Sequence, residues 1–129
     1  MKIVYFGNEA RVKIKNGVDL IANSIKTTLG PKGRNVLYGF HYGFPVVTKD
    51  GVTVSRQCEA KDPTEQLGLL LIREVAQKTA DDAGDGTTTA AVIAQAIFTE
   101  GLKVLGTGAN SILVKRGIDL AVKEAVGYR

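Results

Sequence analysis

Apolar residues recur every three or four positions along four segments of the chain, and this spacing limits the possible folds more than any other feature. In the first segment they stand at Ile14, Val18, Ile21, Ile25 and Leu29. Such a spacing places side chains on one face of an α-helix. It recurs over residues 62–83, 87–105 and 110–129. The sequence therefore predicts a mainly α fold of about four helices.

Capping and helix-breaking residues predict the ends of these helices. Asn8 is a suitable N-cap for the first helix, and Gly30-Pro31 ends it because proline cannot continue a helical hydrogen-bond ladder. Asp62 caps the second helix, and Pro63 takes its first position. The remaining boundary signals are Gly84 with Gly86, Gly106 with Gly108, and Asn110 or Ser111.

The second predicted helix, residues 62–83, is apolar on more than one face. One stripe consists of Leu67, Leu70, Leu71 and Val75, and another of Leu69, Ile72, Ala76 and Ala80. A helix that is apolar on two sides is normally buried on two sides. If nothing covers the second stripe, we expect a large exposed apolar patch and self-association.

Two short β-favouring segments lie between the first two predicted helices. Residues 35–38 and 45–48 flank a glycine-bounded aromatic stretch, 39–44, which predicts a hairpin with an exposed tip. Residues 1–6 alternate loosely and predict a short edge strand. Because an edge strand needs a partner, we expect it to pair with another element.

Composition excludes several classes of protein. The chain has 129 residues, of which 44% are hydrophobic and 23% charged, as is typical of one globular domain. The single cysteine, Cys58, and the single histidine, His41, exclude an intramolecular disulfide and a Cys/His zinc site. We expect no membrane span and no signal peptide, and hence a cytoplasmic protein. The net charge is +4, but the basic residues are scattered, so nucleic acid is not an expected partner.

The most informative stretch reads Ala83-Gly84-Asp85-Gly86-Thr87-Thr88-Thr89-Ala90. A glycine-flanked acid followed by three threonines at a helix start resembles an anion site, because free N–H groups and the helix dipole both attract phosphate. A carboxylate beside phosphate needs a bridging cation, so Asp85 points to Mg²⁺. The alternative is that Asp85 or Thr87 only caps the helix.

Two further segments have residues suited to phosphate. In the stretch 27–35, two glycines and the cations Lys32 and Arg34 follow a helix end, although cations there also complement the helix dipole. In the stretch 48–53, Lys49 and Asp50 precede a glycine in what is locally an ordinary turn. If the turn faces the other segments, Lys49 neutralises phosphate charge, and Asp50 orients a water or assists metal binding.

Together these segments resemble the ATP-site segments of group I chaperonins of the GroEL type, in order and in spacing. The matching motifs are Thr28-Leu29-Gly30-Pro31-Lys32-Gly33-Arg34-Asn35, Thr48-Lys49-Asp50-Gly51-Val52 and Ala83-Gly84-Asp85-Gly86-Thr87-Thr88-Thr89. The resemblance extends through residues 6–11, 94–97, 99–103 and 113–119, and so covers nearly the whole chain.

The resemblance implies an ATP site that uses Mg²⁺. It implies that the nucleotide is contacted by Thr28, Leu29, Gly30 and Pro31, that Lys49 approaches phosphate, that Asp85 ligates Mg²⁺, and that the phosphates are held by Gly86, Thr87, Thr88 and Thr89. Asp50 matches an aspartate implicated in hydrolysis, which positions the attacking water. Residues 1–129 then form the N-terminal half of an equatorial, ring-forming domain.

By the same resemblance the protein is a subunit of an ATP-dependent folding chaperone that assembles with other chaperonin subunits. Its first strand and hairpin are expected to join a sheet with a neighbouring subunit, although the tip at 40–44 is more aromatic than in the family. The family continues into intermediate and apical domains, through which unfolded clients and a co-chaperonin bind, and into a second catalytic aspartate. We therefore expect weak ATPase activity from this chain alone. The alternative is a truncated or split, non-catalytic module that joins or modulates chaperonin rings.

Overall fold

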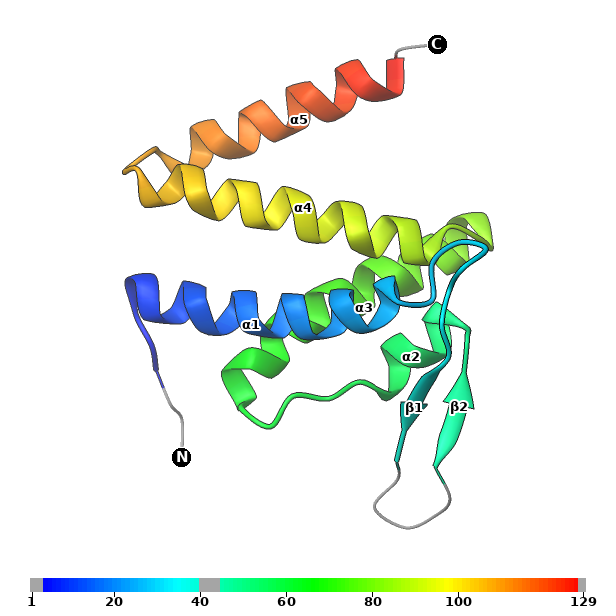
Figure 1. Cartoon of the computed structure of the whole chain (residues 1–129). Coiled ribbons are helices and arrows are strands. Elements are labelled where there is room, and N and C mark those ends of the chain that lie inside the picture. The colour runs from blue at the N-terminus through cyan, green and yellow to red at the C-terminus, as the bar shows by residue number, and fades with distance from the viewer. Residues whose placement is uncertain (1–3, 40–44, 128–129) are drawn as a thin grey trace. The chain divides into compact units, whose positions relative to one another are not determined.

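A computed structural model describes residues 4–39 and 45–127, and Figure 1 shows the order of the elements. The helices are α1 (Gly7–Lys26), α2 (Gly51–Gln57), α3 (Pro63–Ala83), α4 (Thr87–Gly106) and α5 (Ser111–Gly127). Two strands, β1 (Val36–Tyr38) and β2 (Val46–Thr48), lie between α1 and α2 in the chain. The predicted mainly α fold with a small hairpin is confirmed. The chain divides into two compact units, residues 1–96 and 97–129.

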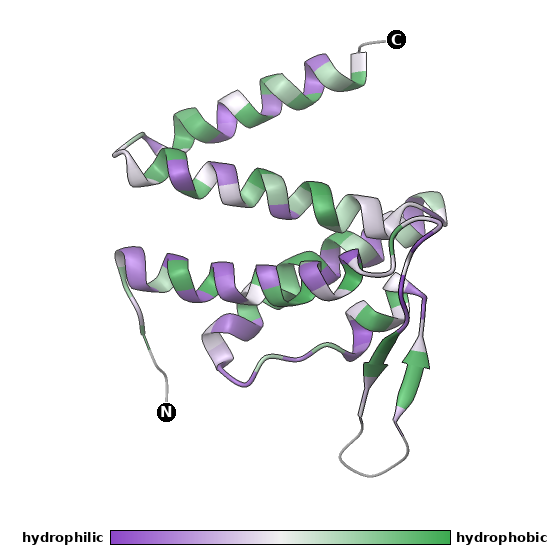
Figure 2. Cartoon of the chain, viewed as in Figure 1, coloured by the Kyte–Doolittle hydropathy of each residue, from purple (hydrophilic) through white to green (hydrophobic). Residues whose placement is uncertain are grey.

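The core of the first unit lies between α1 and α3, which pack along each other. Its fully buried apolar side chains include Val18, Ile21, Ala22 and Ile25 of α1, and Leu69, Ile72 and Ala76 of α3. In Figure 2, apolar and polar residues alternate along both helices, as the predicted periodicity requires. The spacing of three and four therefore identifies the buried face of each helix correctly.

Two glycines let the backbones of α1 and α3 touch. A Cβ atom on Gly17 would lie 1.7 Å from the carbonyl oxygen of Glu65, and one on Gly68 would lie 2.0 Å from the carbonyl oxygen of Ile14. Ordinary van der Waals contact begins at 3.4 Å. Neither position can hold a side chain at this helix separation.

An ion pair lies beside the crossing of these two helices. The Lys13 Nζ donates a hydrogen bond to Asp62 Oδ2 at 2.6 Å and lies 4.9 Å from the centre of the Tyr5 ring. Asp62 is the N-cap of α3, as predicted, and accepts a hydrogen bond from the backbone N–H of Thr64. The hydrogen bond from Lys13 is the main cause that lowers the pKa of Asp62 below its ordinary value.

Helix α2 was not predicted, and its presence corrects the expectation of about four helices. Lys49-Asp50-Gly51 reads locally as a turn, whereas Asp50 is the N-cap of a seven-residue helix. Seven residues make about two turns, which is too short for an apolar periodicity to stand out. Tertiary contacts hold the helix in place, because Val54 and Ser55 are buried and the Arg73 side chain donates to the carbonyl oxygens of Ser55 and Cys58.

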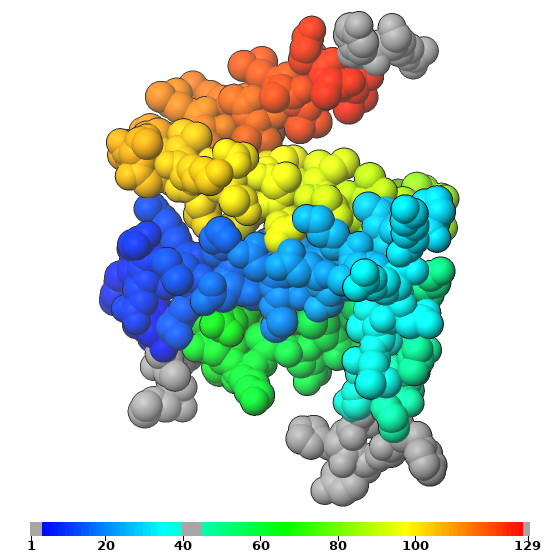
Figure 3. Space-filling view, in the orientation of Figure 1, coloured from blue at the N-terminus to red at the C-terminus, as the bar shows by residue number. Residues whose placement is uncertain are grey.

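The two strands form the predicted antiparallel hairpin. Val36 pairs with Thr48, Leu37 with Val47, and Tyr38 with Val46. In the space-filling view of Figure 3, strand β1 lies beside the end of α1, and Val36 lines a groove together with residues of α1. The predicted tip at 40–44, which includes His41, lies outside the described residues, as does the start of the predicted first strand at 1–3. Val4–Phe6, the rest of that segment, form no strand in this chain.

The ends of α1 differ from the prediction. The helix begins at Gly7 after Phe6, which makes no side-chain capping bond, so Asn8 lies in the first turn and is not the cap. It ends at Lys26, three residues before the predicted Leu29. Gly30, the predicted stop signal, has a positive φ of 77° and belongs to the loop that follows.

The second apolar stripe of α3 is exposed. Leu67, Leu70 and Leu71 keep 57%, 42% and 49% of their surface accessible, while the other stripe is packed on α1. These residues form the exposed apolar patch that is expected when nothing covers the second stripe, and self-association stays a prediction.

Helix α4 corrects the prediction that no segment approaches a membrane span. The described part of the chain contains one helix, Thr87–Gly106, that is long and apolar enough to cross a bilayer by length and composition. Core helices of soluble proteins meet the same criterion. The helix also carries an ion pair between Glu100 and Lys103.

In the second unit, α5 begins as predicted. The Asn110 side chain accepts a hydrogen bond from the backbone N–H of Ile112 at 2.9 Å, which makes it the capping group. None of the residues of α5 is buried. Its exposed large apolar side chains are Ile112, Leu113, Leu120, Val122 and Val126.

Candidate functional site

The turn between α3 and α4 has the geometry that its glycines predict. Gly84 ends α3 in the left-handed conformation with φ of 70°, and Gly86 precedes α4 with φ of 78°. Both conformations favour glycine, because a Cβ atom would clash with the backbone. Between them Asp85 is exposed, and its Oδ1 accepts a hydrogen bond from the N–H of Gly86 at 2.7 Å. This turn therefore presents a carboxylate to solvent beside a helix start.

The three threonines occupy the first turn of α4. The carbonyl oxygen of Gly86 accepts the first helical hydrogen bond, from the N–H of Ala90 at 2.9 Å. The N–H groups of Thr87, Thr88 and Thr89 precede that bond and have no acceptor within the helix. They point along the helix axis at its positive end. This end of α4 can therefore hold an anion.

The structure brings three of the predicted segments together at Gly51, the first residue of α2. A Cβ atom on Gly51 would lie 2.4 Å from Thr88 Oγ1 and 3.3 Å from Thr28 Oγ1. Thr28 follows α1, and Thr88 belongs to the first turn of α4. The segments are far apart in the sequence but meet at one end of the first unit, where Figure 1 shows the turn between α3 and α4. The predicted convergence of the three motifs is therefore present in the fold.

Asp50 stands at this meeting point as the N-cap of α2. Its carboxylate accepts hydrogen bonds from the N–H groups of Val52 and Thr53, both at 3.2 Å, and from the Thr53 hydroxyl at 2.6 Å. The hydroxyl bond is the main cause that lowers the pKa of Asp50 below its ordinary value. The side chain stays exposed. Asp50 is thus a carboxylate held ionised at neutral pH, which suits orienting a polar group better than accepting a proton.

The loop after α1 is tightly folded. The Thr28 hydroxyl donates to the carbonyl oxygen of Ile25 at 2.7 Å, and the N–H of Arg34 donates to the carbonyl oxygen of Thr27 at 2.7 Å. A Cβ atom on Gly33 would lie only 2.3 Å from the carbonyl oxygen of Thr28. This glycine therefore serves the loop's own fold.

The remaining predicted residues are exposed around this loop and turn. Leu29, Gly30, Pro31 and Lys49 are all exposed, and so is Thr89. Gly51 belongs to one of the matching motifs, but nothing in the local sequence predicts its contacts with Thr28 and Thr88.

A metal ion at this site would have few protein ligands. Among the described residues, no group of three or more His, Cys, Asp or Glu side chains could hold a metal ion. Mg²⁺ does not need such a group, because it keeps several waters and uses one or two carboxylates together with substrate phosphates. The exposed Asp85 carboxylate beside the start of α4 fits that requirement.

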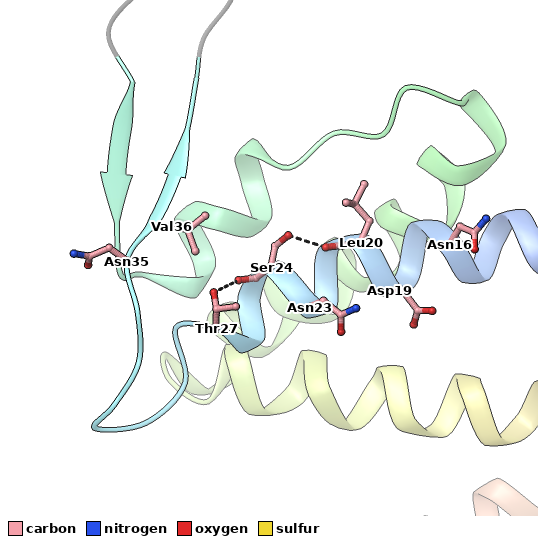
Figure 4. A pocket seen from close by; sticks show the side chains of 8 residues that line it. All are labelled: Asn16, Asp19, Leu20, Asn23, Ser24, Thr27, Asn35 and Val36. Carbon is pink, nitrogen blue, oxygen red and sulfur yellow. Dashed lines mark hydrogen bonds between the residues drawn. The ribbon is translucent and has the colours of Figure 1, made fainter.

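A groove of about 630 Å³ lies on a neighbouring face of α1, shown in Figure 4. It is lined by Asn16, Asp19, Leu20, Asn23, Ser24, Thr27, Asn35 and Val36. Thr27 and Asn35, at the two ends of the candidate stretch 27–35, line it, and the Ser24 and Thr27 hydroxyls donate to helix carbonyl oxygens. The groove therefore adjoins the loop after α1 but includes none of the residues expected to contact nucleotide.

The acid in this groove is already paired. Gln95 of α4 donates to Asp19 Oδ1 at 2.8 Å and to Asn23 Oδ1 at 3.2 Å. Burial raises the pKa of Asp19, but hydrogen bonds from Lys15 and Gln95 outweigh burial and hold the pKa below its ordinary value. The two hydrogen bonds from Gln95 join the first half of α4 to α1.

Comparison with known families agrees with this arrangement. Residues 21–128 match the family model of the TCP-1/cpn60 chaperonins. The match includes all three segments that meet near Gly51, and the mainly helical fold with one hairpin is the one expected for that family. The chain belongs to the TCP-1/cpn60 chaperonin family.

Proposed function

We propose that the chain is the N-terminal equatorial segment of a group I chaperonin subunit and that it binds the phosphates of ATP with Mg²⁺. The observation that carries the proposal is the convergence of Thr28, Gly51 and Thr88 from three separate segments. Family membership supports it, because chaperonins as a family bind ATP and assemble from several subunits.

The first turn of α4 holds the phosphate groups in this proposal. The N–H groups of Thr87, Thr88 and Thr89 and their hydroxyls supply donors at the positive end of a 20-residue helix. Asp85 would hold Mg²⁺, and the bound ion would neutralise part of the phosphate charge. Lys49, which is exposed next to Asp50, adds a positive charge.

Asp50 orients the attacking water in the proposed hydrolysis. Its lowered pKa keeps it ionised, and its exposed carboxylate can accept a hydrogen bond from water. Phosphoryl transfer depends mainly on positioning and charge neutralisation, so a weak base in the right place is sufficient. The resemblance places a second catalytic aspartate outside this sequence. We therefore propose that the chain alone binds nucleotide but turns it over slowly.

Isothermal titration calorimetry with MgATP tests the proposed site. Asp85→Asn should weaken Mg²⁺-dependent binding by at least about tenfold, because even groups that only orient a metal ligand matter that much. Asp119→Asn, which removes another exposed aspartate, from α5, should leave affinity unchanged. Equal affinities of the wild type and Asp85→Asn, or no binding to the wild type, would contradict the proposal.

Mixing the chain with full-length chaperonin rings distinguishes a nucleotide-binding subunit segment from a non-catalytic assembly module. The chain should leave the ATPase rate of full-length chaperonin rings unchanged if its role is to bind nucleotide as a subunit segment. A loss of ring activity on mixing would favour a non-catalytic module that joins or modulates rings.

A further inference from the structure

Gly51 is the residue at which three separate segments of the candidate site pack against one another. The residue is buried, and its backbone faces α1, the loop that follows α1, and α4 at once. A Cβ atom there would lie 2.4 Å from Thr88 Oγ1, 3.2 Å from Ile25 Cγ2 and 3.3 Å from Thr28 Oγ1. The first distance is far below van der Waals contact, whereas the other two require their neighbours to shift by only a few tenths of an ångström.

The rest of α2 is fixed, so a side chain at position 51 cannot be absorbed by moving the whole helix. The Arg73 Nε donates to the carbonyl oxygen of Ser55 at 2.9 Å, and its Nη2 donates to the carbonyl oxygen of Cys58. The Arg56 Nη2 also donates to Gln77 Oε1 at 3.1 Å. Both arginine contacts join α2 to α3. Any displacement is therefore concentrated at the beginning of α2.

Two responses to a side chain at position 51 are possible, and both change the site. Threonine in a helix has only two favoured χ1 rotamers. Thr88 can therefore rotate to the other rotamer, which moves its hydroxyl away from its present position. Otherwise the start of α2 moves away from α4 and carries Asp50 with it. The separation between Asp50 and the first turn of α4 thus depends on the absence of a side chain at Gly51.

We infer that Gly51 is a positioning residue of the nucleotide site, which holds Asp50 next to the phosphate-binding turn of α4. The inference rests on the proposed function. Gly51 does not itself contact the nucleotide in this proposal. Gly51 acts through the position of Thr88 and of the start of α2.

A double-mutant cycle with MgADP as the titrated ligand tests this inference. Gly51→Ala should weaken MgADP binding by at least about tenfold in the wild-type background and by less than about twofold in the Thr88→Ala background, because coupled residues in contact are not additive. Gly101→Ala is the matched control, because it adds the same methyl group to a helical glycine with nothing within 4 Å of the new atom. It should bind as the wild type does.

Circular dichroism at the same temperature separates weak binding from unfolding. If Gly51→Ala alone is unfolded, the Gly51→Ala/Thr88→Ala variant should be folded and should bind as Thr88→Ala does. Equal losses in the two backgrounds, or wild-type affinity in Gly51→Ala, would overturn the inference alone. Failure of the wild-type chain to bind MgADP would overturn both the inference and the proposed function.

Discussion

Replacing Gly17 by alanine should destabilise the first unit by about 2 kcal/mol. A methyl group there would lie 1.7 Å from the carbonyl oxygen of Glu65, while ordinary contact begins at 3.4 Å, so the shortfall is 3.4 − 1.7 = 1.7 Å. The obstacle is backbone, which cannot rotate out of the way as a side chain can. Helices α1 and α3 must therefore separate along their buried interface.

The magnitude follows from two opposing contributions. Overpacking typically costs about 1–3 kcal/mol, and a backbone obstacle places Gly17→Ala at the upper end of that range. A gap of about 1 Å already removes up to about half of the dispersion attraction across the interface. Alanine is the better helix former by about 1 kcal/mol, which offsets part of the loss. A net destabilisation of about 2 kcal/mol remains.

Amide hydrogen exchange read by mass spectrometry measures this loss, because peptides from α1 and α3 report on the first unit alone. Protection of the amides around Ile21 should fall by roughly 30-fold, which corresponds to about 2 kcal/mol. Gly117→Ala in α5 adds the same methyl group where nothing lies within 4 Å, and it should leave the exchange of α1 unchanged. Protection of α1 in Gly17→Ala that matches or exceeds the wild type would refute the reasoning.

Three further predictions concern residues outside the candidate site. Asp62→Asn should reduce the loss of stability on acidification, because Lys13 lowers the pKa of Asp62 in the folded protein. The stability that Asp62 contributes is present above the unfolded pKa of about 3.9 and is lost as the pH falls through the folded pKa. Unfolding followed by circular dichroism from pH 7 to pH 2 measures it. Replacing Leu70 and Leu71 by lysine should reduce dye binding and self-association in light scattering, because both are exposed. Arg73→Met should speed amide exchange in α2, because two carbonyl oxygens lose a charged donor.

Each of these predictions has an outcome that contradicts it. An Asp62→Asn variant with an unchanged acid transition would show that the ion pair adds nothing measurable. A compact wild-type monomer that binds no hydrophobic dye would show that the exposed stripe of α3 is covered. Exchange of α2 that is equally slow in Arg73→Met and in the wild type would show that burial of Val54 alone holds the helix.

The sequence predicts the long helices well, but it predicts neither the short helix α2 nor the first residue of α1. The boundaries of α3 follow directly from Asp62, Pro63 and Gly84, because each has a strong local conformational preference. Helix α2 escapes prediction because the buried Val54 and the contacts from Arg73, which stabilise it, belong to the tertiary structure. Local capping rules also fail at Asn8, because the N-cap of α1 is Phe6, two residues earlier.

In the candidate site, too, the sequence predicts local features but not the contacts between distant segments. The sequence indicates that Asp85 and the following threonines form a helix start suited to phosphate, since glycines and threonines have local meanings. It does not show by local rules that Thr28 lies near Thr88, because 60 residues separate them in the sequence. Only the resemblance to chaperonins links these segments before the fold is known. The packing around Gly51 depends on the crossing of three elements and is visible only in the structure.

The capping role of Asp50 affects how an inactive version of this protein should be made. Asp50→Ala removes the carboxylate that holds the N–H groups of Val52 and Thr53, so any lost turnover would mix damaged chemistry with a frayed α2. Asparagine caps helices about as well as aspartate. Asp50→Asn therefore removes the charge while it keeps the helix start intact, and it is the substitution that can trap bound ATP in an undistorted site.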